Sequence, residues 1–214
     1  TTDTIQLDKE LSVYQLILAY RQKGHLIAKT NPIRARKDRN ANLALENFGF
    51  TDADLSSTFE AGKFVGLGKT TLKNIVDHLQ KCYTTHIGIE FSAVNSRKKS
   101  EWLINAIEHT MLQPVPIVQK KRILQKLNEG VMFEKFLHTK YIGQKRFSLE
   151  GGETTIAALD AIINTASLNG VQEVVIGMAH RGRLNILANI LGKTYEQIFS
   201  EFEGTATPDT TMGT

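Results

Sequence analysis

The sequence predicts a mixed α/β fold, in which a mostly helical amino-terminal domain (1–115) precedes the opening units of an α/β domain (116–214). Three observations lead to this prediction. Apolar residues recur at three- and four-residue spacing through much of the first half. Two prolines flank a single residue in "QPVPIV" (113–118), which is typical of a domain boundary. Helix, strand and helix then alternate toward the carboxyl end, as in an α/β layer.

The first domain is expected to be built from helices that are separated by turn-rich segments. A helix over 8–23 places Leu11, Tyr14 and Leu18, with Ile17, on one face, and Gly24 ends it. A helix over 70–81 has an apolar stripe formed by Leu72, Ile75, Val76 and Leu79. The further elements predicted in this half are a helix start at 51–55 with Thr51 as cap, a strand or extended link over 87–94, and a helix over 100–111 capped by Ser100.

The second domain is expected to differ from the first in its pattern of helices and strands and to contain a buried strand. "VQEVVIG" (171–177) is a short β-branched run, which is typical of such a strand. A buried strand needs neighbours, so we expect its free edge to be exposed and prone to pair with another copy. The other predicted elements are a helix over 119–142 with a possible break at Gly130, an extended segment over 145–152, a helix over 153–170, a loop over 178–183, a helix over 184–192 and a polar tail over 204–214.

Composition argues against several classes of function. The 214 residues are 41% hydrophobic and carry a net charge of +4, which suits an ordinary globular core. The basic clusters at 34–39, 97–99 and 119–122 lack interleaved aromatic residues, so we interpret them as solvated faces and expect no nucleic-acid partner. Cys82 stands alone, which excludes an intrachain disulfide and favours a reducing compartment. No apolar run approaches the ~20 residues that span a bilayer, so no membrane partner is expected.

Two motifs suggest ligands that the surrounding pattern does not support. "GKFVGLGKTT" (62–71) resembles a phosphate-binding loop, but such a loop needs a glycine five positions before Gly68, where Lys63 stands. The six histidines show no paired spacing with cysteine or acidic residues, so no metal site is predicted. Glu150 and Glu153 could serve as acid–base groups, but stabilisation of the following helix start is the favoured interpretation.

The stretch "MAHRGRLN" (178–185) carries the candidate site. It lies where the predicted strand ends and a helix begins near Leu184, and the free N–H groups of a helix start attract anions. Arg181 and Arg183 add two cations whose planar forks suit phosphate. His180 can bind a carboxylate or oxyanion and can transfer a proton near neutral pH. The stretch therefore predicts an anionic ligand, phosphate or carboxylate; the alternative is that both arginines pair with neighbouring acids.

Several motifs of this chain closely resemble one enzyme family. They are "GMAHRGRLNILANILGK" (177–193), "KRFSLEGGE" (145–153), "AYRQKGHLIAKTNPI" (19–33), "IGIEF" (87–91) and "EWL" (101–103). The family is the thiamine-diphosphate-dependent dehydrogenase component of the 2-oxoglutarate dehydrogenase complex. The resemblance follows the family order over almost the whole chain, and its two longest motifs are highly specific.

The resemblance implies oxidative decarboxylation of 2-oxoglutarate with thiamine diphosphate and Mg²⁺ as cofactors. His180 matches the family's histidine that contacts the substrate and the covalent intermediate, and Arg181 matches the arginine that contacts the cofactor's diphosphate. It assigns no role to Arg183. The family's Gly-Asp magnesium motif and second substrate histidine are absent here, and "MGT" (212–214) resembles the residues just before that histidine's segment. "SAVNS" (92–96) departs from the family, which usually has a methionine and a histidine there.

The resemblance also implies the setting of the chain. We expect an amino-proximal fragment, inactive alone, of a longer homodimeric enzyme whose first α/β domain binds the diphosphate. Its partners would be the lipoyl-bearing succinyltransferase and the lipoamide dehydrogenase of a multienzyme complex of the tricarboxylic acid cycle, in the bacterial cytoplasm or the mitochondrial matrix. Two alternatives stay open: a 2-oxoadipate dehydrogenase homologue, and a non-catalytic module in which the helical region 1–115 docks subunits.

Overall fold

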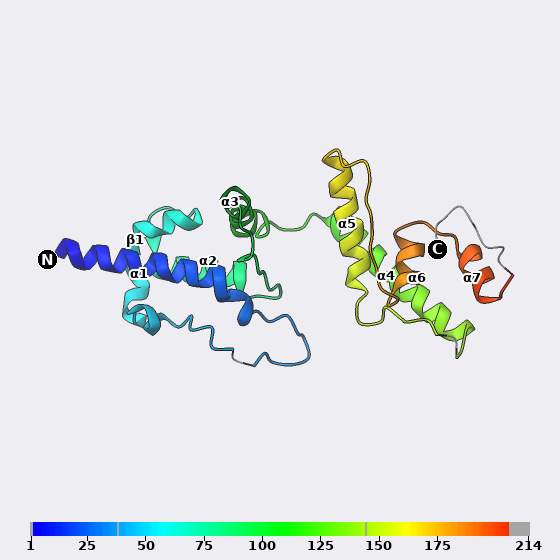
Figure 1. Ribbon diagram of the computed structural model, residues 1–214. Helices are drawn as coiled ribbons and strands as arrows, with labels where there is room; N and C mark the ends of the chain where they lie inside the picture. The colour runs from blue at the N-terminus through cyan, green and yellow to red at the C-terminus, as the bar shows by residue number, and fades with distance from the viewer. Residues whose placement is uncertain (1, 38, 144, 206–214) are drawn as a thin grey trace. The chain divides into compact units, whose positions relative to one another are not determined.

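The computed structural model describes residues 2–37, 39–143 and 145–205 (Figure 1). Most of these residues are helical. Close contacts divide the chain into two compact units, and the boundary lies between Pro114 and Val115, in the proline-flanked segment. Within the described ranges, no helix is long and apolar enough to cross a membrane.

Unit 1 is organised around two helices, α1 (Thr2–Lys23) and α2 (Leu72–Tyr83), which pack against each other. The remaining helical elements are the 3₁₀ turns η1 (Gly24–Leu26), η2 (Leu45–Phe48), η3 (Asp52–Ser56) and η4 (Glu60–Val65), the helix α3 (Arg97–Asn105) and the π-helix η5 (Ala106–Thr110). Two short strands, β1 (Thr58–Phe59) and β2 (Thr70–Thr71), pair antiparallel with Thr58 opposite Thr71.

The core of unit 1 confirms one predicted helix face and corrects another. The stripe expected for α2 is buried, and the helix begins two residues later than predicted because Thr71 is its cap, accepting from the Asn74 N–H. In α1 the expected face was wrong in part. The structure leaves Leu11 exposed, half-buries Tyr14 and Leu18, and buries Ile17 together with Val13, Leu16 and Tyr20. Apolar residues surround much of α1, so its spacing alone does not determine which face packs.

A buried ion pair joins three elements of unit 1. Arg21 of α1 donates from Nε (2.7 Å) and Nη2 (2.8 Å) to the two carboxylate oxygens of Glu108, which lies on the π-helix η5. The Tyr83 hydroxyl at the end of α2 donates to the same carboxylate at 2.7 Å. Burial, reinforced by the charge of Glu108, raises the pKa of Tyr83, so this hydroxyl stays a donor. The buried carboxylate is thus satisfied from both sides.

Two helix starts in unit 1 differ in their caps. Thr51 precedes η3 as predicted, and its N–H donates to Asp54 Oδ2 at 2.9 Å. Ser100 was wrong as a cap: α3 begins at Arg97, and Ser96 is the residue whose Oγ accepts from the Lys99 N–H. The segment 87–94 contains no strand and is the extended link of the two alternatives.

The described residues of unit 2 form four helices: α4 (Ile117–Lys140), α5 (Thr154–Leu168), α6 (Arg183–Asn189) and α7 (Tyr195–Phe202). Helices α5 and α6 both pack against α4 (Figure 1). The predicted break at Gly130 is wrong. α4 continues through this glycine, and a Cβ there would make ordinary van der Waals contacts with Ile156 at 3.5 Å and Asn185 at 3.6 Å. Helix α7 was not predicted. The polar tail predicted over 204–214 lies outside the described residues from 206 onward.

The predicted strand over 171–177 is wrong, and with it the α/β layer in the described part of unit 2. The segment has no regular secondary structure, and Val175 is 95% exposed. A strand requires a second strand to pair with its N–H and C=O groups. Among residues 115–143 and 145–205, no other segment adopts strand structure. The described part of this unit is therefore helical.

Candidate functional site

Two segments that are far apart in sequence, 147–149 and 180–185, are joined directly in unit 2. The Gly182 N–H donates to the Phe147 carbonyl at 2.7 Å, and Arg181 Nη1 donates to the Ser148 carbonyl at 3.1 Å. Gly182 has φ of 72°, and a Cβ there would lie 2.5 Å from Leu149 Cδ1. Only glycine fits this left-handed and crowded position without strain.

A buried carboxylate and a buried amide hold the two segments on α4. Glu134 Oε1 accepts from the Leu149 N–H at 3.1 Å and from Asn185 Nδ2 at 3.0 Å. Asn185 Nδ2 also donates to the Gly130 carbonyl at 3.0 Å, and its Oδ1 accepts from Asn189 at 2.7 Å. Glu134 and Asn185 are both buried. Because buried polar groups are costly unless they are paired, this network fixes the start of α6 relative to 147–149.

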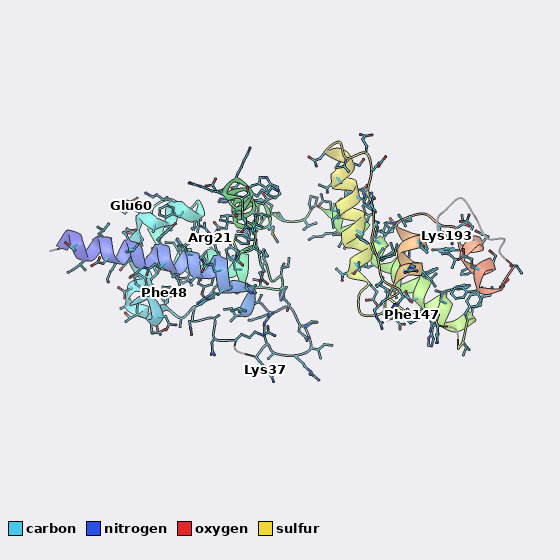
Figure 2. The ribbon with its side chains drawn as sticks, in the orientation of Figure 1. Arg21, Lys37, Phe48, Glu60, Phe147 and Lys193 are labelled. Atoms are coloured by element: carbon cyan, nitrogen blue, oxygen red, sulfur yellow. The ribbon has the colours of Figure 1, made fainter. Side chains whose placement is uncertain are left out.

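Phe147 adopts an unusual backbone conformation beside the candidate histidine. Its φ is +48°, which is rare for a bulky residue and costs on the order of 1–3 kcal/mol. The conformation brings the Phe147 ring to 4.3 Å from the His180 ring, centroid to centroid, with 54° between the planes. Phe147 is labelled in Figure 2. Such strain persists only where the surroundings enforce it, and here the hydrogen bond from Gly182 does so.

A cavity of about 310 Å³ opens beside these segments and is rich in cationic side chains. Its lining residues are Lys145, Arg146, Phe147, His180, Arg183, Leu184, Ile198, Glu201 and Phe202. The carboxylate in this set, Glu201, pairs with Lys193 at 2.5 Å. The cavity therefore presents three permanent cations and a histidine against one acid that is already paired.

Arg146, which lines this cavity, has one paired and one unpaired guanidinium nitrogen. Its Nη2 donates to His138 Nδ1 at 2.9 Å, and because a guanidinium has no acceptor, the histidine nitrogen must accept. Its Nη1 is buried and has no hydrogen-bond partner within the described ranges. Buried donors are almost always paired. Because Arg146 lines the cavity, a carboxylate or phosphate bound there would lie beside its guanidinium group.

The structure separates the residues predicted from "MAHRGRLN". His180 and Arg183 line the cavity, whereas Arg181 turns toward Ser148 and is not part of the lining. In the described part of the chain neither arginine pairs with an acid, which contradicts the alternative reading of the motif. The anion site expected at the helix start is reduced, because the N–H groups of Gly182 and Arg183 already bond to protein carbonyls.

Glu134, Arg146 and Phe147 are the residues that sequence reasoning missed. Arg146 and Phe147 lie within the quoted "KRFSLEGGE", but neither received a role. Glu134 occupies a helix position with no local signal, since its partners lie 15 and 51 residues away. No group of three or more His, Cys, Asp or Glu side chains in the described ranges is placed to hold a metal ion.

Comparison with known proteins gives relatives along nearly the whole chain. No protein-family model matches it. The chain is 45% identical over 214 residues to a "multifunctional 2-oxoglutarate metabolism enzyme" of Mycolicibacterium vanbaalenii, with 99% of this chain and 17% of that protein covered. It is 46% identical over 203 residues to a "2-oxoglutarate dehydrogenase E1/E2 component" of Corynebacterium glutamicum, with 92% and 16% covered. The chain thus spans about one sixth of the length of these relatives.

Proposed function

We propose that this chain contributes a wall of the active site of a succinyl-transferring 2-oxoglutarate dehydrogenase. The observation that carries the proposal is the cationic cavity beside His180, which Lys145, Arg146 and Arg183 help to line. 2-Oxoglutarate carries two carboxylates, and thiamine diphosphate carries a diphosphate, so either anion suits these donors. The names of the relatives support this choice of substrate.

The residues present fit thiamine diphosphate as the cofactor. A 2-oxo acid lacks an electron sink for the carbanion that loss of carbon dioxide leaves, and thiamine diphosphate supplies one when it is bound. Within the described residues only Nη1 of Arg181 is engaged, so its other donors are free to grip a diphosphate. Arg183 and Arg146 face the cavity and would bind the second anion. Magnesium would be held by residues outside this chain.

His180 is assigned to the substrate. Its ring lies at the cavity and rests on Phe147, which limits its rotation. An imidazole at this position can donate a hydrogen bond to a substrate oxygen. The network of Glu134 and Asn185 would keep the ring and the arginines in register.

The partners follow from the same proposal. The succinyl group would pass to a lipoyl group on a succinyltransferase, and a lipoamide dehydrogenase would reoxidise the carrier. The name of one relative, "2-oxoglutarate dehydrogenase E1/E2 component", supports a link between dehydrogenase and transferase. We also propose a homodimer, and a cytoplasmic location in a bacterium or a place in the mitochondrial matrix.

The proposal is tested by carbon dioxide release from 2-oxoglutarate by the purified full-length protein, with and without thiamine diphosphate and Mg²⁺. Release that requires both cofactors is the expected result, with 2-oxoadipate as the parallel substrate for the homologous activity. Faster turnover of 2-oxoadipate would assign the chain to that homologue. No release from either substrate would leave the chain as an assembly module. The 214-residue chain alone should be inactive and should bind the cofactor no more tightly than about millimolar, roughly −4 kcal/mol.

A further inference from the structure

A second cationic cavity lies in unit 1, on the long loop between η1 and η2. Its volume is about 810 Å³, which is within the range of small-molecule sites. Figure 2 labels Lys37 on this loop. Five of the residues that line the cavity carry a permanent positive charge: Lys29, Arg34, Arg36, Lys37 and Arg39. The proposed dehydrogenase function gives this cluster no role.

These five cations have no acidic partner in the described part of the chain. Elsewhere in unit 1, Lys9, Lys73 and Arg97 each lie within 2.8 Å of a carboxylate oxygen. Like charges in one short segment repel each other, and a bound polyanion would offset that repulsion. The sequence alone suggested that 34–39 is a solvated face. Solvation does not explain why these cations line a cavity.

Hydrogen bonds to and from the backbone, not ion pairs of the charged side chains, hold the loop in shape. The Asn31 side chain accepts from the Ile33 and Arg34 N–H groups at 2.9 and 3.2 Å. The Lys29 N–H donates to the Thr85 carbonyl at 2.6 Å, which ties the loop to the end of α2. The side chains of Arg34 and Lys29 are therefore presented on an ordered backbone.

Arg36 combines a structural contact with an unused donor. Its Nη1 donates to the Ala28 carbonyl and to Thr30 Oγ1, both at 3.1 Å. Its Nε is buried and has no partner within the described residues. The contacts of Nη1 hold the guanidinium group of Arg36 in place at the cavity.

The cavity also has an apolar wall. Ile27, Pro32 and Ile33 line it together with the cations, and Ile33 is 90% exposed. An exposed isoleucine beside guanidinium groups suits a ligand that carries both an apolar or aromatic part and negative charge. Three of the five cations are arginines, whose planar forks match phosphate oxygens in pairs.

We propose that this cavity binds an organic di- or triphosphate, with the phosphates on the arginines and the organic part against Ile33. A small molecule is favoured over an acidic protein segment because the cations surround a concave space and not a flat face. The site belongs to unit 1 and is separate from the residues around His180.

The test measures binding of ATP and of inorganic triphosphate to the full-length protein by calorimetry at about 0.1 M salt, where distant charges are screened. The test variant is Arg34→Gln/Arg39→Gln, because these side chains make no hydrogen bond or ion pair within the described residues and their loss spares the loop's own contacts. The matched control is Lys120→Gln/Lys121→Gln, which removes the same charge from an exposed face of α4. Arg181→Gln separates this site from the active site.

We expect ATP to bind the wild-type protein more tightly than inorganic triphosphate, and the affinity for both to fall at least about tenfold in Arg34→Gln/Arg39→Gln. The Lys120/Lys121 control and Arg181→Gln should stay within about twofold of wild type. Equal affinity of the loop variant and wild type would overturn the site, and equal affinity for both probes would overturn the role of the apolar wall. Tighter binding of an oligoglutamate peptide than of ATP, with the same variant dependence, would assign the loop to an acidic protein partner instead.

Discussion

Gly182→Ala should destabilise unit 2 by two separable effects. The first is the backbone: an alanine at φ of 72° costs roughly 1–2 kcal/mol. The second is a collision, because the new Cβ would lie 2.5 Å from Leu149 Cδ1 and 3.2 Å from Leu149 Cβ. Leu149 is buried against Ile156 and Ile186, so it cannot move away freely, and such overpacking costs about 1–3 kcal/mol. The expected total is about 2–5 kcal/mol.

Gly192→Ala is the matched control for the backbone effect. Gly192 has φ of 73°, and a Cβ there would meet nothing within 4 Å. Native-state hydrogen exchange of the amides in α4 and α6 reports the free energy of unfolding of unit 2 separately from unit 1. The difference between Gly182→Ala and Gly192→Ala should equal the cost of the Leu149 collision.

A double variant isolates the collision further. Leu149→Ala destabilises by leaving a cavity, but it also removes Leu149 Cδ1, the atom that would lie 2.5 Å from the new Cβ, and leaves only the Leu149 Cβ at 3.2 Å. Gly182→Ala/Leu149→Ala should therefore cost less than the sum of the two single variants, by about 1–3 kcal/mol. Strict additivity, or equal costs for Gly182→Ala and Gly192→Ala, would refute the close packing of 147–149 on 180–185.

Four further predictions concern single side chains. His180→Ala in the full-length protein should lower turnover of 2-oxoglutarate by ~10²–10³ with little change in cofactor affinity measured by calorimetry. Arg181→Lys should weaken cofactor binding in the same assay by about tenfold or more, because the fork geometry is lost. Glu134→Gln keeps an acceptor oxygen and should be mild, whereas Glu134→Ala strands two donors and should cost about 2–4 kcal/mol by hydrogen exchange. Hydrogen bonds from Lys9, and then from the N–H and hydroxyl of Thr51, lower the pKa of Asp54 to about 2. These contacts therefore stabilise unit 1 above pH 4, and the stabilisation is lost as the pH falls toward 2. In Lys9→Met the acid dependence of the urea midpoint should become smaller, because only the Thr51 contacts remain.

Helices were predictable from the sequence where their apolar stripe is narrow. The stripe of α2 is buried as expected, and α5 ends at Leu168 where Asn169 and Gly170 close it. In α1 the apolar residues surround the helix, so the packed face depends on neighbours such as Phe64, whose ring lies 4.8 Å from that of Tyr14. Local periodicity carries no information about such a neighbour.

The strand over 171–177 shows the complementary limit. Its β-branched residues favour a strand, but the segment has no regular secondary structure. Pairing needs a second strand, and no such strand exists elsewhere in the described part of unit 2. Local propensity therefore does not determine whether a strand finds a partner.

The residue types of the candidate site were predictable from the sequence, but the different contacts of its two arginines were not. The motif places two arginines on either side of Gly182, and their spacing gives no reason to distinguish them. The left-handed glycine reverses the chain between them, so that Arg181 turns back to the Ser148 carbonyl while Arg183 opens onto the cavity. That reversal is held by the Phe147 carbonyl. The cationic cavity thus forms where the two motif segments meet, and neither segment contains it alone. Its preference for anions depends on this tertiary contact more than on the start of α6.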